Sequence, residues 1–291
     1  MSQADHHKQS GLVELHTAVL LFGGTALFSK LIPLSALDIT LLRCIVASFV
    51  LALIVKVSKK QLRLNATKDY FIAAGLGIIV SLHWVTYFAS MQLSSVAIGM
   101  IAFFTYPVMT VLIEPIVTGH HIKKVDMISA TIVLLGVILL IPEANLGNNV
   151  TLGIAMGMLS AVFFTARNLL HKKYFSAYSG TKAMFYQTSV AVLFLAPWQT
   201  IEPAQITQHI WWLILLLGVV FTAIPHALFT ASLRHLSAKT VSLVSCLQPF
   251  YGSMLALLFL GENLDMKTAI GGILVVATAI FETRKNRKKA T

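Results

Sequence analysis

The sequence contains few charged residues, and few of these are acidic. Only 11% of the 291 residues are charged, with 11 Asp and Glu against 22 Lys and Arg, whereas an ordinary soluble domain is about one quarter charged. A water-soluble surface cannot be built from so few charges. Together with the 57% hydrophobic content, this scarcity excludes an ordinary soluble enzyme or binding domain and favours a membrane protein.

Cysteines and catalytic motifs are also scarce. Cys44 and Cys246 both lie within apolar runs, where neither a disulfide framework nor a metal cluster is indicated. The sequence has no G-x-S-x-G, H-E-x-x-H or phosphate-binding loop, and no paired aspartates in the middle of an apolar run. An intramembrane enzyme and an ATP-driven pump are therefore disfavoured. We expect no enzymatic activity, no cofactor and no bound metal.

The sequence consists instead of apolar runs separated by short polar segments. A helix needs about 20 residues to cross a hydrocarbon core of roughly 30 Å. The runs are continuously apolar, which excludes the alternating pattern of a β-barrel. We predict an all-α membrane protein with ten transmembrane helices, near residues 13–31, 39–57, 70–91, 95–117, 126–142, 152–170, 182–199, 210–233, 240–260 and 267–282.

The basic residues predict the orientation of these spans. With the N-terminus in the cytoplasm, 18 of the 22 Lys and Arg lie on the cytoplasmic side, as the positive-inside rule requires. We therefore expect a multi-pass protein of the inner (plasma) membrane with both termini cytoplasmic, and no cleavable signal peptide. The net charge of +11 is explained by this topology and by contact with anionic lipid, not nucleic acid. The expected partners are the bilayer and a small-molecule substrate, and the sequence is compatible with a monomer.

The two halves of the chain resemble each other. A shift of 142 residues, without a gap, pairs Phe22 with Phe164 and Pro107 with Pro249. Five spans per half is an odd number, so the halves must be inverted, and inverted repeats offer a route to alternating access around a central cavity. The predicted units are a first five-helix repeat at 11–142, a second, inverted repeat at 152–283, and a basic cytoplasmic tail at 284–291.

Several stretches carry a resemblance to a known family. They are Phe22-Gly23-Gly24, Leu42-Arg43, Leu93-Ser94-Ser95-Val96-Ala97, and Leu258-Phe259-Leu260-Gly261-Glu262-Asn263-Leu264. The last is similar to the "FLGE-x-L" that ends each repeat in the EamA-type transporters of the drug/metabolite transporter superfamily. The first copy departs from it, with His120 in place of the glutamate. The resemblance covers nearly the whole chain and implies a ten-helix, basket-like metabolite transporter, often an exporter of amino acids. It also implies an interfacial or structural role for Arg43.

Three prolines are candidate gates or helix kinks. Pro107 and Pro249 are equivalent in the two repeats, and Pro225 directly precedes His226. Each proline removes a helical hydrogen bond and clashes with the preceding turn, so each should bend or unwind its helix. Static packing of bent helices is the alternative, because proline is frequent in transmembrane spans.

Ionisable side chains inside spans are costly and therefore suggest function. His83 and His226 could reach one central site, because the repeat counterpart of His226 is Trp84. The alternative is a histidine hydrogen-bonded within the bundle. Arg167, with Asn168, could bind a carboxylate or a phosphate, and snorkelling to the membrane interface is the competing explanation.

Aromatic and uncharged polar residues complete the predicted binding site. Aromatic rings suit an amphipathic solute or a cation, although packing and lipid contact are their commoner roles. The candidates of these two kinds are Trp84, Tyr87, Tyr106, Phe229, Tyr251, Gln187, Ser245 and Gln248.

We predict a secondary transporter that exports amino acids or related small metabolites across the inner membrane by alternating access. The alternatives are export of other amphipathic or cationic compounds, such as drugs and quaternary amines, and a membrane sensor that does not transport. The spans hold no obvious carboxylate near their middles. This absence disfavours drug–proton antiport and favours transport of a zwitterion.

Overall fold

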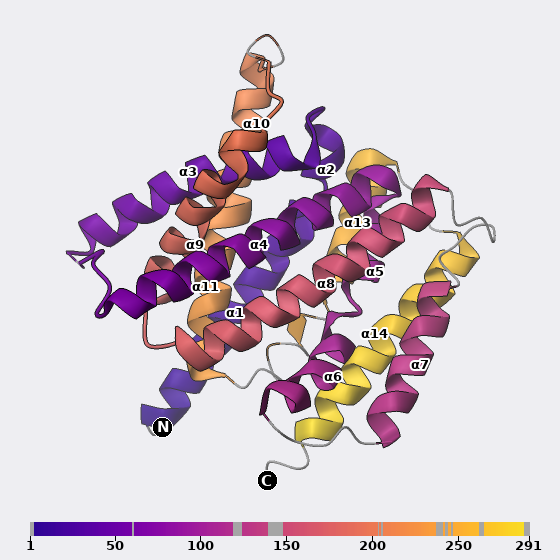
Figure 1. Cartoon of the computed structure of the whole chain (residues 1–291). Coiled ribbons are helices and arrows are strands. Elements are labelled where there is room, and N and C mark those ends of the chain that lie inside the picture. Colours follow the sequence, from indigo (N-terminus) through magenta and orange to yellow (C-terminus); the bar gives the residue numbers. More distant parts are fainter. Residues whose placement is uncertain are drawn as a thin grey trace.

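The computed structural model describes residues 3–59, 61–118, 124–138, 148–202, 204, 206–236, 241, 244, 245, 247–261 and 265–287. These residues contain helices and no β-strand (Figure 1), which confirms the all-α prediction. Within this part of the chain, five helices are long and apolar enough to cross a membrane. Shorter apolar helices accompany them at Val96–Thr110, Met127–Gly136 and Met266–Thr278.

The first half of the chain folds into α1 (Gln3–Thr25), α2 (Phe28–Leu31), α3 (Ala36–Val57), α4 (Thr67–Leu93), α5 (Val96–Phe103), α6 (Tyr106–Thr118) and α7 (Lys124–Ile138). Serine side chains begin two of these helices. Ser35 accepts a hydrogen bond from the Asp38 N–H at the start of α3, and Ser95 accepts one from the Ile98 N–H at the start of α5. Each serine thereby satisfies an N–H group that has no partner within the first helical turn.

The second half folds into α8 (Asn149–Tyr174), α9 (Gly180–Leu195), α10 (Gln208–Gly218), α11 (Ile224–His235), α13 (Gln248–Leu260) and α14 (Met266–Arg287). A 3₁₀ turn, Ala196–Trp198, ends α9, and a π-helical turn, Val219–Ala223, joins α10 to α11. Helix α14 continues through residues 284–287. Part of the predicted tail therefore belongs to the last helix.

Some predicted spans are divided where we expected one continuous helix. The span 95–117 separates into α5 and α6 at residues 104–105, and the span 13–31 separates into α1 and α2 at residues 26–27. Pro107 and Pro249 each stand second in their helices, α6 and α13. A proline is tolerated there because an N–H in the first turn has no helical acceptor. These prolines therefore start new helices rather than bend existing ones.

Pro225 is accommodated differently, next to the π-helical turn. In an α-helix the carbonyl of Phe221 would accept from the N–H of residue 225, which proline lacks. Thr25, at the end of α1, donates its hydroxyl to this carbonyl at 3.0 Å. The bend in the α10–α11 segment is thus joined to the first helix of the chain by a side-chain hydrogen bond.

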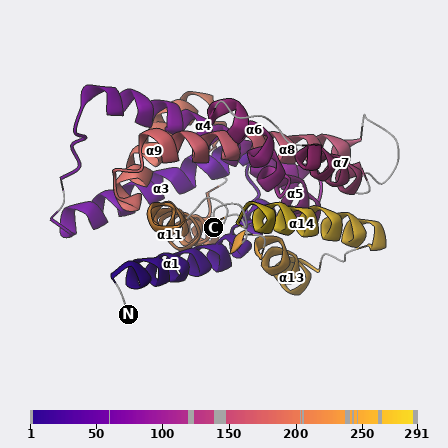
Figure 2. The same ribbon diagram turned by 90° about the horizontal axis from the view of Figure 1, so that it is seen from below.

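The helices of the two halves are interleaved. Helix α4 packs against α8 and α9, α3 packs against α9, and α11 packs against both α1 and α9. Viewed from below, α1 and α13 lie on one side of the bundle, opposite α4 and α9 (Figure 2). Helices α7 and α14 form a pair at one edge (Figure 1). The core therefore lies where helices from both halves cross.

Small residues allow α8 to approach its neighbours closely. A Cβ atom at Gly157 would lie 2.7 Å from the Ala102 Cβ, and one at Gly153 would lie 2.9 Å from the Ser90 carbonyl oxygen. Both distances are shorter than ordinary van der Waals contact. The spacing of these two glycines predicts such packing between membrane helices, and the structure confirms it.

Tyr178, between α8 and α9, connects the second half to the segment before α4. Its hydroxyl donates to Asp69 Oδ2 at 2.6 Å and accepts from the Asn65 N–H at 2.8 Å. The burial of Tyr178 and its hydrogen bond to Asp69 raise the pKa of its hydroxyl above the ordinary value. The phenol therefore keeps its proton and serves as a fixed bridge between the halves.

Replacing Tyr178 by phenylalanine should destabilise the protein by about 1–2 kcal/mol, because buried Asp69 loses one of its hydrogen bonds and the Asn65 N–H loses its acceptor. The measurement is the thermal unfolding of the purified protein in detergent. Tyr174→Phe is the matched control. Because Tyr174 is 50% exposed, this variant should leave the melting temperature unchanged. Equal melting temperatures for the two variants would contradict the bridging role.

Candidate functional site

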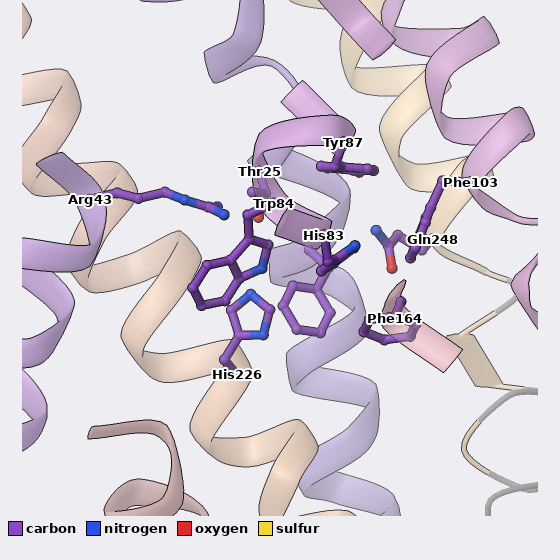
Figure 3. A pocket seen from close by; sticks show the side chains of 10 residues that line it. Thr25, Arg43, His83, Trp84, Tyr87, Phe103, Phe164, His226 and Gln248 are labelled. Carbon is purple, nitrogen blue, oxygen red and sulfur yellow. The ribbon is translucent and has the colours of Figure 1, made fainter. Parts of the chain in front are cut away.

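A small cavity of about 30 Å³ lies at the crossing of helices from both halves. Ten described side chains line it, and each is at most 7% exposed. The cavity wall is therefore buried in this conformation, and Figure 3 shows how the side chains lie around it. The lining residues are Phe22, Thr25, Arg43, His83, Trp84, Tyr87, Phe103, Phe164, His226 and Gln248.

Two pairs of residues that are equivalent in the two halves meet at this cavity. Phe22 and Phe164 form one pair and Trp84 and His226 the other, each separated by 142 residues. The His226 ring lies 4.6 Å from the Phe22 ring and 4.8 Å from the Trp84 ring, between ring centroids. The cavity wall is therefore assembled from corresponding positions of both halves, as the sequence comparison suggests.

His83, on α4, is oriented by Ser160 on α8. Its Nδ1 atom lies 2.8 Å from Ser160 Oγ and 3.2 Å from the Ser160 carbonyl oxygen. The Ser160 hydroxyl donates its own hydrogen to the His83 carbonyl at 3.0 Å. Both oxygens near Nδ1 can therefore only accept, so Nδ1 carries the ring hydrogen and Nε2 is left as the acceptor. The histidine is both hydrogen-bonded within the bundle and part of the cavity wall.

Arg43, on α3, reaches the cavity as a buried charge. It is 1% exposed, and its guanidinium carbon lies 4.5 Å from the Trp84 ring centroid and 4.7 Å from that of Phe88. None of its three side-chain nitrogens has a hydrogen-bond partner among the described residues. Figure 3 shows the guanidinium directed toward Thr25 and Trp84. Of the two roles expected from the sequence, interfacial or structural, this burial and these ring contacts agree with the structural one.

Arg167, which we predicted to bind a ligand, is hydrogen-bonded to other side chains of the protein. Its Nε donates to Gln187 Oε1 at 2.8 Å, and its terminal nitrogens donate to Asn168 Oδ1, Thr230 Oγ1 and Met184 Sδ. Arg167 is only 2% exposed, so it does not snorkel to the membrane interface. The structure brings Arg167, Asn168 and Gln187 together in a network beside the cavity, outside its lining residues.

Other predicted residues meet in a second hollow between α6, α8 and α11. Tyr106, Asn168 and Phe229 line it, together with Thr110, Leu169, Lys172, Leu233 and Val241. Four aromatic rings separate it from the central cavity. Phe164 lies 4.9 Å from Tyr106, 5.2 Å from Phe103 and 5.8 Å from Phe229, between ring centroids.

The remaining predicted residues lie away from both hollows. The Ser245 hydroxyl donates to the Val241 carbonyl at 2.8 Å. Tyr251 packs where α13 crosses α1, and a Cβ atom at Gly23 would lie 2.7 Å from the Tyr251 Cβ. The Pro249 side chain, Cys246, His120 and residues 262–264 lie outside the described part of the chain. In the part of the chain that is described, no group of three or more His, Cys, Asp or Glu could hold a metal ion.

Five residues of the cavity wall are missing from the predicted binding set. Two of them, Phe22 and Phe164, could have been found from the repeat pairing, and Arg43 could have been found as a full charge within an apolar span. Thr25 and Phe103 carry no such local signal. The lining residues missing from the set are Phe22, Thr25, Arg43, Phe103 and Phe164.

Comparison with known proteins identifies the family. Residues 9–141 and 151–283 each match the EamA-like transporter family. The chain is 25% identical over 297 aligned positions to an uncharacterized transporter of Bacillus subtilis (strain 168), which covers 99% of this chain and 94% of the relative. It is 24% identical over 214 positions to the pseudopaline exporter CntI of Pseudomonas aeruginosa, covering 72% of this chain and 74% of that protein.

The fold also has a counterpart among solved structures. One crystal structure superposes with a TM-score of 0.69 at 16% sequence identity, covering 97% of this chain and 99% of that one. The family match spans almost the whole sequence, and it confirms the resemblance in the sequence motifs. The chain therefore belongs to the EamA-like transporter family and is a multi-pass membrane transporter.

Proposed function

We propose that this protein is a secondary transporter of amino acids or related small metabolites, and that the central cavity is its substrate site. The observation that carries the proposal is a buried cavity lined by both halves of the chain. Ligand pockets for small molecules typically enclose about 300–1,000 Å³ and combine apolar walls with a few polar groups. This cavity has such a wall, but at about 30 Å³ it is smaller than that range in this conformation, so the surrounding helices must separate to admit a substrate.

Alternating access between two inverted five-helix repeats is the mechanism that we propose. Equivalent residues of the two halves face each other across one cavity, as the exchange of two conformations requires. The start of α1 and the end of α14 lie on the same side of the bundle (Figure 1), which fits an even number of crossings. The distribution of basic residues supports a cytoplasmic location for both ends in the inner membrane.

The aromatic wall between the two hollows is the proposed gate on one side of the substrate. Phe103 ends α5, and Tyr106 begins α6 directly before Pro107. The rings of Phe103 and Tyr106 are stacked, 5.2 Å apart between centroids, at the point where α5 ends and α6 begins. A change in the angle between α5 and α6 would move these rings, and with them the barrier between the hollows.

A cationic drug is the less favoured solute. Aromatic rings can bind cations, but the Arg43 guanidinium already lies over two of the rings. Like charges in a buried site repel strongly because little water screens them. The relative named as a pseudopaline exporter supports outward transport of a metabolite.

Counterflow in liposomes tests the proposed function. Purified protein is reconstituted, and uptake of labelled amino acids, sugars, nucleotides and quaternary amines is measured against an internal unlabelled pool. We expect exchange of amino acids or closely related metabolites and no exchange of quaternary amines. Exchange of none of these classes would argue for the sensor alternative, and exchange of amines alone would argue for drug transport.

A matched pair of histidine variants tests the position of the site. His226→Gln should reduce the counterflow rate about three- to tenfold, because it removes a buried ring that packs against Phe22 and Trp84 in the cavity wall. His209→Gln is the control, since His209 is exposed at the start of α10. Equal rates in the two variants would remove His226 from the substrate path. Both rates are normalised to the amount of reconstituted protein.

A further inference from the structure

The charge of Arg43 is only partly compensated by the protein. The rings of Trp84 and Phe88 lie near the guanidinium and attract it through their electron-rich faces. Such faces do not replace hydrogen-bond acceptors for the five N–H groups that point outward in the guanidinium plane. A fully buried charge without acceptors is costly. The Arg43 side chain can therefore bind a hydrogen-bond acceptor from outside the described part of the protein.

None of the ten described residues that line the cavity is acidic. Two buried carboxylates of the first half are hydrogen-bonded to other groups. Asp38 accepts from Ser35 and from the Thr200 backbone and hydroxyl, and Asp69 accepts from Tyr178. A solute that carries a carboxylate would supply the acceptor.

We infer that Arg43 binds the carboxylate of the transported solute, so that the substrate class is carboxylate-bearing metabolites. The inference rests on the proposed transport function and names the chemistry of that same site. A guanidinium matches a planar carboxylate with two parallel N–H···O bonds. The ten described lining residues include no lysine and no second arginine, so a single negative charge fits better than a phosphate dianion.

The far side of the cavity suits the amino group of the same solute. Figure 3 shows Arg43 entering from one side, with His83 and Gln248 on the other. His83 Nε2 and the Gln248 amide oxygen are neutral acceptors, and aromatic faces surround them. A zwitterion can thus place its carboxylate at Arg43 and its ammonium near His83 and Gln248.

Fluorescence of Trp84 offers a binding measurement that is independent of transport. Trp198, Trp211 and Trp212 are 68%, 46% and 64% exposed, whereas Trp84 is buried beside Arg43. Replacing the three exposed tryptophans by phenylalanine leaves Trp84 as the reporter. The probes are phenylalanine, leucine and lysine, each compared with its α-amide, which lacks the carboxylate. Binding is titrated in detergent, and counterflow of the same pairs is measured in liposomes.

In the Arg43 protein, at least one amino acid should bind about tenfold or more tightly than its amide, as expected for a charge-assisted hydrogen bond. Arg43→Gln should remove this difference by weakening the acid and leaving the amide nearly unchanged. Arg43→Lys keeps the charge but lacks the planar pair of N–H donors. Its acid–amide difference in affinity should lie between that of the parent protein and that of Arg43→Gln. If Arg43→Gln does not fold, Arg43→Lys alone carries the comparison. Arg63→Gln is the control, because Arg63 is exposed.

The outcomes separate the inference from the proposed function. Equal affinity for acid and amide with Arg43 in place, or an equal loss of both in Arg43→Gln, would overturn the role of Arg43 while counterflow could still establish transport. A clear acid–amide difference without counterflow would keep Arg43 as a carboxylate site and remove the transport function. Failure of every acid to bind would overturn the inference.

Discussion

Replacing Gly180 by alanine should destabilise the protein by about 3 kcal/mol, the upper end of the usual cost of overpacking. Gly180 starts α9 where it meets α11. A Cβ atom there would lie 2.3 Å from the Ala227 carbonyl oxygen and 2.7 Å from the Ala231 nitrogen. Both are backbone atoms of a helix and cannot rotate away as a side chain can. We expect a strongly reduced melting temperature in detergent and a low yield of monodisperse protein.

Gly75→Ala is the matched control for this variant. Gly75 lies within α4, and no atom lies within 4 Å of the position that its Cβ would occupy. Alanine favours a helix over glycine by up to about 1 kcal/mol, so this variant should be as stable as the parent or slightly more so. A Gly180→Ala protein that melted at the same temperature as Gly75→Ala would contradict the close approach of α9 and α11.

Replacing Arg167 by methionine should cost roughly 2–4 kcal/mol. The variant leaves Gln187 and Thr230, which are almost fully buried, without the donors that they now bind. Each unsatisfied buried group costs about 1–3 kcal/mol. Arg167→Lys should also be destabilised, because an ammonium cannot reproduce the planar fork of donors. The measurement is again thermal unfolding in detergent.

A double-mutant cycle makes this prediction sharper. Replacing both partners of a buried hydrogen bond by apolar groups can be nearly neutral. Arg167→Met combined with Gln187→Leu should therefore lose less stability than the sum of the two single changes. Additive losses would show that the hydrogen bond between the two side chains contributes nothing. A normally stable Arg167→Met with impaired counterflow would instead restore the ligand role predicted from the sequence.

The sequence was sufficient to predict the helical class and the disturbance of the helices at Pro107 and Pro249, but not the break between α1 and α2. Both follow from local chemistry, because the runs are too apolar for water and a proline cannot continue a helical hydrogen-bond ladder. The pairing of Phe22 with Phe164 also placed two residues of the cavity wall at equivalent positions before their contacts were known. These features depend on neighbours in the chain or on its internal similarity.

The roles of Arg43 and Arg167 could not be told apart in this way. Each is a single arginine within an apolar run, so the local signal is the same. What distinguishes them is the tertiary surroundings. Arg167 meets Thr230, 63 positions along the chain, whereas the described neighbours of Arg43 are aromatic rings that offer no acceptor. Packing between distant helices decides which charge is satisfied, and no pattern within one helix records it.

The bridge between Thr25 and Phe221 has an energetic consequence for motion of the two halves. The Thr25 hydroxyl also lies 3.5 Å from the Leu21 carbonyl oxygen of its own helix, so it keeps an acceptor when α1 and α11 move apart. Breaking the hydrogen bond between Thr25 and Phe221 should therefore cost about one net hydrogen bond, on the order of 1 kcal/mol, which thermal fluctuation supplies readily. The same movement would leave the Phe221 carbonyl without the donor that stands in for the missing N–H of Pro225.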